Sequence, residues 1–257
     1  MIIGTGATWC NRRNHINEDF FVVNNEKNLY IICDGVSRDR YPVRGRSSAS
    51  DISKLFAETV EGNICQCQAV DDPGEILHES ILVASREIAH YNDVHYPCAD
   101  YLDNDFAATV GICIWIVDNV AYCIYIGDCM AYLYRHGTIS AITENQTEKV
   151  AEFRRKNGFN RETSLCIRKN FRNNSNSPFG YGALTGEPSA LDFLRQNRTA
   201  LYPNDRIFLL TDGLVDFFTS GLVDYEDDAE KILEKSNGSQ YRNCDDDKTI
   251  IKIISEQ

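Results

Sequence analysis

Apolar segments that end at acidic residues most limit how this chain can fold. Stretches rich in β-branched and aromatic residues predict strands at 19–25, 29–34, 108–118, 120–128, 130–137, 205–212 and 248–255. Acids stand at the ends of five of them, in Asn17-Glu18-Asp19, Asp34-Gly35, Gly127-Asp128, Asp212-Gly213 and Asp245-Asp246-Asp247. A strand interior cannot hold an unpartnered carboxylate at low cost. The pattern therefore predicts a β-rich core with acids at the sheet ends, where they can meet.

The spacing of apolar residues predicts two long amphipathic helices, over 47–62 and from Pro73 through 92. Shorter helices are expected at 146–157 and 226–236, and residues 108–140 have the pattern of an antiparallel meander. Strands, then helices, then more strands favour an α+β layered architecture over alternating βαβ units.

Composition excludes several classes of protein. The net charge of −12 gives no basic footprint for nucleic acid. The longest apolar runs are much shorter than a membrane span, and the start has no apolar leader segment. We expect a cytoplasmic protein that acts as a monomer and binds neither nucleic acid nor membrane.

Cysteine usage agrees with a reducing compartment. Most of the ten Cys lie in apolar runs, where Cys behaves as a small hydrophobe. Cys65 and Cys67 form an isolated C-x-C without a second pair at metal spacing, which argues against zinc.

The chain shows no linker and no internal repeat, so one domain over 1–257 is expected. Segment 158–200 is rich in Asn, Ser, Gly and Pro and predicts a long irregular loop. Loops of that length inside a compact domain are usually functional or mobile.

Acids gathered at one sheet edge would repel one another and have raised pKa values unless cations neutralised them. Carboxylate and water ligands suit Mg²⁺ or Mn²⁺, and a Gly after an Asp lets the backbone approach a ligand. One Asp-Gly pair alone is usually only a turn. Five such acidic sites together favour convergence on a metal centre.

Five segments of the sequence occur in the order of the motifs of a known protein family. They are NEDFF, LYIICDGVS, YIGDCMAYLYRHG, LLTDGLVDFF and DDDKTIIKI. Together they resemble the metal-dependent serine/threonine protein phosphatases of type 2C, over nearly the whole chain. The compact chain is most similar to stand-alone bacterial members, although its motifs diverge.

The resemblance implies a four-layer α-β-β-α sandwich of two antiparallel sheets flanked by helices, with 158–200 in the place of the family's variable flap. It also implies two Mn²⁺ or Mg²⁺ ions. Matched position by position, the metal ligands are Asp19, Asp34 in the bridging place, the Gly35 carbonyl, Asp212 and Asp246, with Glu18 acting through water. Asp128 and Asp216, together with Asp212, match a third metal site in some members. Asp216 follows Asp212 by four residues, so on a helix the two share a face.

The implied reaction is hydrolysis of phosphoserine and phosphothreonine in proteins by a water or hydroxide that bridges two cations, with Asp34 and Asp19 as the central catalytic acids. A cognate protein kinase would supply the substrate. The chain departs from the family in substrate handling. Asn14 replaces the usual phosphate-binding Arg, so Arg13 or Arg12 would have to serve, and no His follows the first Asp-Gly. In place of the family's L-T-x-D-H-S the sequence reads AITENQT, without a His.

Two alternatives remain open. The missing Arg and His are compatible with a non-catalytic, phosphatase-like binding or regulatory module. A phosphatase of small molecules is the other alternative, less favoured by the flap and the size of the chain.

Overall fold

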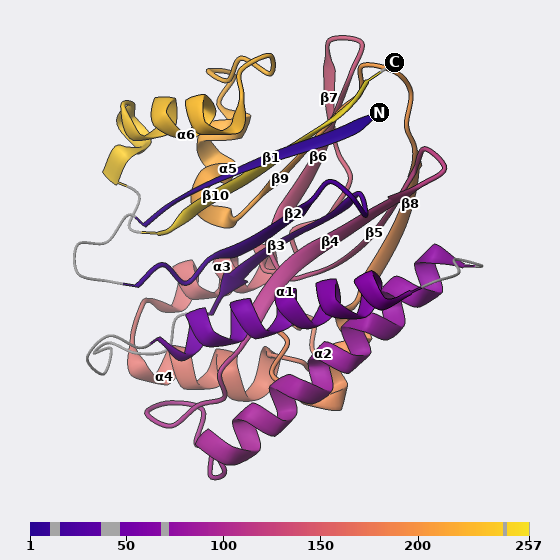
Figure 1. The fold of residues 1–257 in the computed structure, drawn as a ribbon. Helices are drawn as coiled ribbons and strands as arrows, with labels where there is room; N and C mark the ends of the chain where they lie inside the picture. The colour runs from indigo at the N-terminus through magenta and orange to yellow at the C-terminus, as the bar shows by residue number, and fades with distance from the viewer. Residues whose placement is uncertain (11–15, 37–46, 68–71, 244–245, 257) are drawn as a thin grey trace.

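The computed structural model describes residues 1–10, 16–36, 47–67, 72–243 and 246–256, and its core consists of two stacked antiparallel sheets (Figure 1). The first sheet has the order β1 (Ile2–Trp9), β10 (Lys248–Ser255), β9 (Arg206–Leu210), β6 (Met130–Arg135) and β7 (Thr138–Ala141). The second sheet has the order β2 (Phe20–Asn24), β3 (Leu29–Gly35), β4 (Thr109–Val117), β5 (Val120–Ile126) and β8 (Arg195–Ala200).

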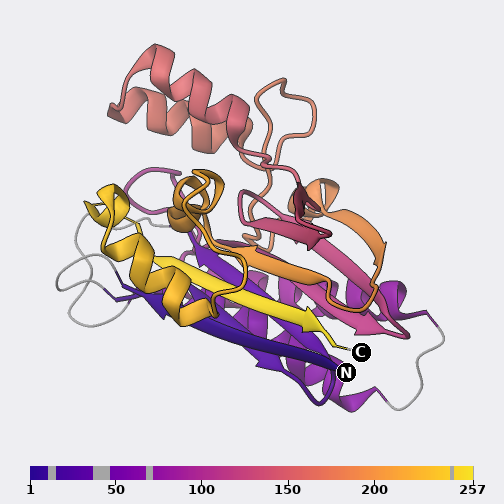
Figure 2. The ribbon, with the colours of Figure 1, turned by 90° about the horizontal axis from the view of Figure 1, so that it is seen from above.

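Helices cover the outer face of each sheet. The second sheet packs against α1 (Ser48–Gln66) and α2 (Pro73–His95), and the first against α5 (Asp212–Thr219) and α6 (Ala229–Asn237) (Figure 1). A further pair, α3 (Glu148–Asn157) and α4 (Arg161–Cys166), stands off one side of the sandwich (Figure 2). Short helical turns occur at Ile167–Phe171, Pro188–Phe193 and Gln240–Asn243.

Three apolar layers hold this arrangement together. The inward faces of the two sheets share one layer, in which Ile32, Ile112 and Leu209 are fully buried. A second layer joins α1 and α2 to the second sheet, and a third joins α5 and α6 to the first sheet. The predicted four-layer α-β-β-α sandwich is confirmed.

Side-chain caps define where the two long helices begin. Ser47 accepts a hydrogen bond from the Ser50 amide at the start of α1. Asp72 accepts from the amides of Gly74 and Glu75 at the start of α2, one residue before Pro73. Such caps satisfy amides that lack a partner within the helix. No helix in the described ranges is both long enough and apolar enough to cross a membrane.

The predicted meander over 108–140 is wrong, because its strands belong to different sheets. Strands β4 and β5 pair in the second sheet, whereas β6 and β7 pair in the first. The chain changes sheet at Gly127-Asp128, and Gly127 has φ +91°, a conformation that favours glycine. The change of sheet carries Asp128 to the end of the sandwich.

The prediction that 158–200 is an irregular loop is also wrong in part. The segment contains α4, two helical turns and the edge strand β8. Tyr181 and Phe179 pack with Phe153 of α3 and with Phe171, so aromatic side chains supply a small core of their own.

Candidate functional site

Five of the predicted acids come together at one end of the sandwich. Asp19 precedes β2, Asp34 lies near the end of β3, Asp128 follows β5, Asp212 begins α5 and Asp246 precedes β10. The charges of the other four each raise the pKa of Asp34, which places all five in one cluster. The predicted convergence of strand-end acids is therefore seen in the fold.

Burial is the main reason that the two central carboxyl groups resist ionisation. The pKa of Asp34 is raised well above its usual value, first by loss of hydration and then by the charges of Asp19 and Asp212. The pKa of Asp19, which is 7% exposed, is raised for the same first reason, with Asp247 and Asp212 adding to the effect. A nearby cation would stabilise the ionised form of both carboxyl groups.

The pKa values of Asp212 and Asp128, which lie nearer the surface, are also raised. Asp212 is exposed by its accessible surface, although the surrounding protein atoms remove part of the hydration of its carboxylate. The loss of hydration, with the charges of Asp128 and Asp246, raises the pKa of Asp212 to about 7. The nearby Asp34 side chain partly offsets this effect on the pKa of Asp212. Burial likewise raises the pKa of Asp128.

Two threonines hold Asp19 in place. Thr211 Oγ1 and Thr249 Oγ1 donate to Asp19 Oδ2 over 2.8 and 2.6 Å. The Thr249 amide in turn donates to Thr211 Oγ1 over 2.9 Å. Thr249 lies in β10 and Thr211 directly follows β9, both of the first sheet, whereas Asp19 directly precedes β2 of the second sheet. These bonds therefore fix the two sheets relative to each other at the acidic end.

Glycines allow the backbones to approach where the acids meet. A Cβ on Gly213 would lie 2.1 Å from the Asp247 carbonyl oxygen, so any side chain there would push α5 away from the start of β10. A Cβ on Gly35 would lie 2.7 Å from the Ala49 carbonyl oxygen and 2.8 Å from that of Glu18. The Gly residue after each of these aspartates is thus required by close packing.

Glu18 takes part in the framework around the acids. Its carboxylate accepts a hydrogen bond from Ser47, the cap of α1. Its amide donates to Asp247 Oδ2 over 2.8 Å. Glu18 is 6% exposed and Asp247 is 5% exposed. Glu18 thereby links the start of α1 to the segment before β10.

The segment AITENQT, in which the expected His is missing, fixes the turn that carries Asp128. Thr147 Oγ1 donates to Asp128 Oδ2 over 3.0 Å. Gln146 Oε1 accepts from the Gly127 amide over 2.9 Å, and the Gln146 amide donates to the Gly127 carbonyl over 3.0 Å. Thr147, Thr211 and Thr249 were not predicted as site residues. Thr211 and Thr249 could have been suspected, because Thr211 directly precedes Asp212 and Thr249 follows Asp247 by two residues.

The remaining predicted site residues lie elsewhere. Asp216 is exposed on α5, one turn after Asp212, and it is not among the groups whose charges raise the pKa values of the clustered acids. Arg12 and Arg13, predicted to bind phosphate, lie outside the described residues.

The donor set suits hard divalent cations, since it consists of carboxylate oxygens with backbone carbonyls close by. In the described ranges, no ion pair joins Asp19, Asp34, Asp128 or Asp212 to a Lys or Arg. Over the same ranges, no group of three or more His, Cys, Asp or Glu side chains is arranged so that it could hold a metal ion as it stands. The raised pKa values of Asp34 and Asp212 have the same physical origin, which is the loss of hydration together with repulsion between carboxylates.

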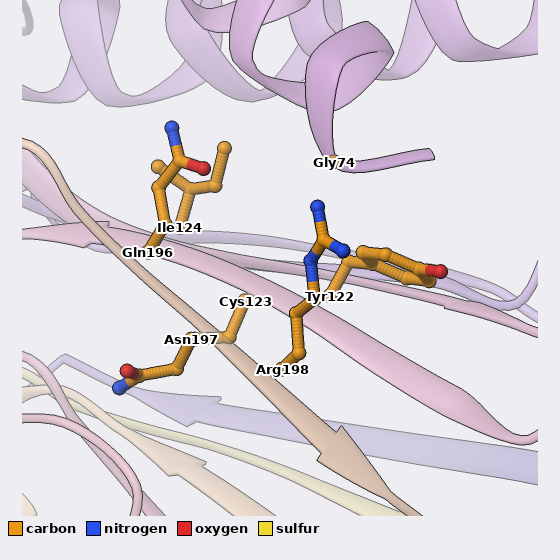
Figure 3. A pocket seen from close by; sticks show the side chains of 7 residues that line it. All are labelled: Gly74, Tyr122, Cys123, Ile124, Gln196, Asn197 and Arg198. Atoms are coloured by element: carbon orange, nitrogen blue, oxygen red, sulfur yellow. The ribbon is translucent and has the colours of Figure 1, made fainter. Parts of the chain in front are cut away.

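A separate cavity of about 320 Å³ lies between β5, β8 and the start of α2 (Figure 3). In Figure 3, Arg198 and Gln196 extend from β8 toward α2, and Asn197 points to the other side of the strand. The Arg198 guanidinium stacks on Tyr122, 5.3 Å from the ring centre, and lies 3.8 Å from Asp72. The residues that line the cavity include no member of the acidic cluster.

Comparisons with known proteins give no match by sequence and many by structure. No family model matches the chain. No curated protein matches it either. Among solved structures, the Mycobacterium tuberculosis serine/threonine phosphatase PstP/Ppp superposes with a TM-score of 0.72 at 18% identity, covering 100% of this chain and 99% of that one. A structure of the PstP catalytic domain in complex with two manganese ions gives 0.73 at 17% identity, with the same coverage.

Two further solved structures give similar matches. PppA of Pseudomonas aeruginosa matches with a TM-score of 0.68 at 17% identity, covering 98% of this chain and 97% of that one. The PPM Ser-Thr phosphatase MsPP of Mycobacterium smegmatis matches with 0.64 at 16% identity, covering 99% and 98%. Over its whole length, the chain therefore has the fold of the bacterial PPM serine/threonine phosphatases, as its motifs predicted.

Proposed function

We propose that the chain is a metal-dependent phosphatase that hydrolyses phosphoserine and phosphothreonine in proteins. The observation that carries this proposal is the cluster of five aspartates at the end of the sandwich, with pKa values raised by burial and by one another. Their positions follow the order of the family motifs. The fold is shared with phosphatases, one of which was crystallised with two manganese ions.

In this proposal, Asp19, Asp34, the Gly35 carbonyl, Asp212 and Asp246 would together hold two Mn²⁺ or Mg²⁺ ions. The ions would supply an activated water and neutralise charge on the phosphoryl oxygens. Glu18 would act through water. Asp128 would hold a third ion, with Asp216 if its side chain turns toward Asp212.

The protein residues contribute orientation and charge. Thr211 and Thr249 stabilise the ionised form of Asp19, because hydrogen bonds to a carboxylate lower its pKa and so oppose the effect of burial. Thr147 acts similarly on Asp128. These hydroxyl groups would keep the carboxylates oriented before an ion binds, which is the usual role of partners around metal ligands.

The test is hydrolysis of p-nitrophenyl phosphate and of a phosphothreonine peptide with Mn²⁺, Mg²⁺ or chelator between pH 6 and 9. We expect activity with the cations, none in chelator, and a loss of at least a hundredfold in Asp34→Asn. A folded protein without activity under any of these conditions would favour the non-catalytic binding module. Hydrolysis of small phosphate esters only would favour a small-molecule phosphatase.

A further inference from the structure

Basic residues on this acidic chain are concentrated in one segment. Residues 148–172 contain eight Lys and Arg and three Asp and Glu, a net charge of +5. The rest of the chain therefore has a net charge of −17, which gives the total of −12. The segment comprises α3, α4 and the helical turn that follows. Arg161, Arg168 and Arg172 of this segment form ion pairs with Asp103 or Asp105. The charges that can make a distinct surface are therefore those of α3.

The packing of α3 leaves its basic residues in solvent. Val150 is buried, and Phe153 packs with it against Ile167 and Phe171. These two residues form the apolar face that holds α3 against the helical turn Ile167–Phe171. Lys149, Arg154, Arg155 and Lys156 are all exposed, and we call these four residues the α3 basic surface.

Most charges of the α3 basic surface are available to a partner. Lys156 pairs with Glu152 over 2.8 Å, but both side chains are more than half exposed. Such exposed pairs are weak and exchange readily. Within the described residues, Lys149, Arg154 and Arg155 form no ion pair.

The helix starts at the acidic cluster and leads away from it. Thr147, the residue before α3, donates to Asp128 over 3.0 Å. At about 1.5 Å per residue, Arg155 lies about 12 Å along the axis from Thr147. In Figure 2, α3 and α4 lie off one side of the sheets, toward the end of the sandwich at which β10 begins. A peptide whose phosphorylated residue reaches the acids can therefore pass along α3.

The far end of α3 also offers an apolar contact. Phe159, in the turn between α3 and α4, is 80% exposed. The Arg154 guanidinium lies over its ring, 5.9 Å from the centre. An exposed aromatic ring beside cationic groups suits a peptide that carries an apolar residue after a run of acids.

We propose that the α3 basic surface docks acidic residues flanking the phosphorylated Ser or Thr of the substrate protein, an inference that rests on the proposed function. An extended peptide advances about 3.3 Å per residue, so a distance of about 12 Å corresponds to about four residues. The substrate class is thus a phosphoprotein with Asp or Glu about three to five residues from the modified residue. Docking would offset the repulsion that such a segment meets near the aspartates.

An anionic membrane is the competing partner for a basic surface with an exposed Phe. The position of α3 favours a peptide, since Thr147, the residue before the helix, contacts Asp128 of the acidic cluster. A surface that binds a membrane would not need to lie next to the acidic cluster.

The experiment compares two phosphothreonine peptides, one with Asp at the positions three to five residues on each side and one with Asn there. We expect kcat/KM with Mn²⁺ to be at least about fivefold higher for the acidic peptide at low salt. In Lys149→Glu/Arg155→Glu, the ratio of the two kcat/KM values should fall to about one or below. The control Lys54→Glu/Arg86→Glu makes the same change of charge on exposed positions of α1 and α2 and should keep the wild-type ratio.

Fluorescence anisotropy of both labelled peptides in chelator gives a readout that needs no turnover. Preferential binding of the acidic peptide, lost only in Lys149→Glu/Arg155→Glu, would support docking even if hydrolysis were absent and the proposed function had failed. Metal-dependent hydrolysis with equal kcat/KM for the two peptides would overturn docking and leave the phosphatase proposal intact. Binding to phosphatidylserine vesicles without preference between the peptides would also overturn it.

Discussion

The Thr211 hydroxyl donates a hydrogen bond to Asp19 over 2.8 Å and so joins the end of β9 to the start of β2 in the opposite sheet. A second bond to Asp19, from Thr249, has a length of 2.6 Å. The acidic end of the sandwich is thus built by contacts between its two sheets, and Asp19 is oriented before any ligand arrives.

Removing these hydroxyl groups should weaken cation binding. In Thr211→Val/Thr249→Val the carboxyl group of Asp19 would lose the two bonds that oppose the effect of burial on its pKa. A proton would then compete better with the cation. We expect Mn²⁺ affinity at pH 7, measured by calorimetry, to fall about 10- to 100-fold, the usual effect of losing a partner of a metal ligand. Thr138→Val, at an exposed position of β7, is the control, and an equal loss there would contradict the interpretation.

The stability of the metal-free protein should fall as pH rises through neutrality. The pKa values of Asp19, Asp34 and Asp128 are raised in the folded state, and that of Asp212 is raised to about 7. An unfolded Asp titrates near pH 3.9. The stabilisation from each group is therefore fully present below about pH 4 and is lost as pH rises through its folded pKa.

Thermal denaturation in chelator between pH 5 and 8 checks this prediction. Asp212→Asn cannot ionise and should melt several degrees above the wild type at pH 8, with a smaller difference at pH 5, which lies closer to the pKa of an unfolded Asp. Mn²⁺ should raise the Tm of the wild type more at pH 8 than at pH 5. The Tm difference between Asp212→Asn and wild type could instead be independent of pH. That result would show that the pKa of Asp212 is not raised in the folded protein.

Gly213 should tolerate no side chain. A Cβ at this position would lie 2.1 Å from the Asp247 carbonyl oxygen, so Gly213→Ala should lower the free energy of unfolding by about 1–3 kcal/mol and separate Asp212 from Asp246. Urea denaturation measures the first effect and Mn²⁺ calorimetry the second. Gly62→Ala in α1 meets no atom within 4 Å and should stabilise the protein by about 0.5–1 kcal/mol. Similar effects at both glycines would refute the packing argument.

The segment that carries α3 and α4 should depend on one buried ion pair. Arg172 binds Asp105 through two hydrogen bonds of 2.8 and 2.6 Å, and both side chains are 2% exposed. Arg172→Leu would leave the Asp105 charge without its main partner and should cost about 3–5 kcal/mol in urea denaturation.

The double variant Arg172→Leu/Asp105→Leu completes the cycle for this pair and should recover part of the loss. Additive effects of the two substitutions would mean that the pair does not hold this segment. Arg168, whose Nε lies 3.7 Å from Asp105, remains in all variants and limits the size of the effect.

The sequence allowed most of the fold to be predicted where apolar periodicity was strong. Strands β3, β4 and β10 and helices α1 and α2 lie where their patterns placed them. Strand β1 was missed because Gly4 and Gly6 interrupt its pattern. Both make room for aromatic rings of the opposite sheet, Tyr30 and Phe21, and only the folded structure shows this. The polar edge strand β8 was missed because its sequence, RQNRTA, has no apolar alternation.

The acids of the site were predictable because each one follows or precedes an apolar strand. The change of sheet at Gly127 was not, since hairpin signals on both sides hid it. The threonines that orient Asp19 and Asp128 could not be assigned, because their roles depend on contacts between segments far apart in the chain.

The most direct test is an anomalous difference map from a crystal soaked in Mn²⁺ and measured at the manganese absorption edge. We predict two peaks flanking Asp34, one also contacting Asp19 and the other Asp212 and Asp246. Asp34→Asn crystals soaked in the same way should show neither peak at full height. Peaks confined to other parts of the surface, or none at saturating Mn²⁺, would contradict the assignment of this acidic cluster as the metal centre.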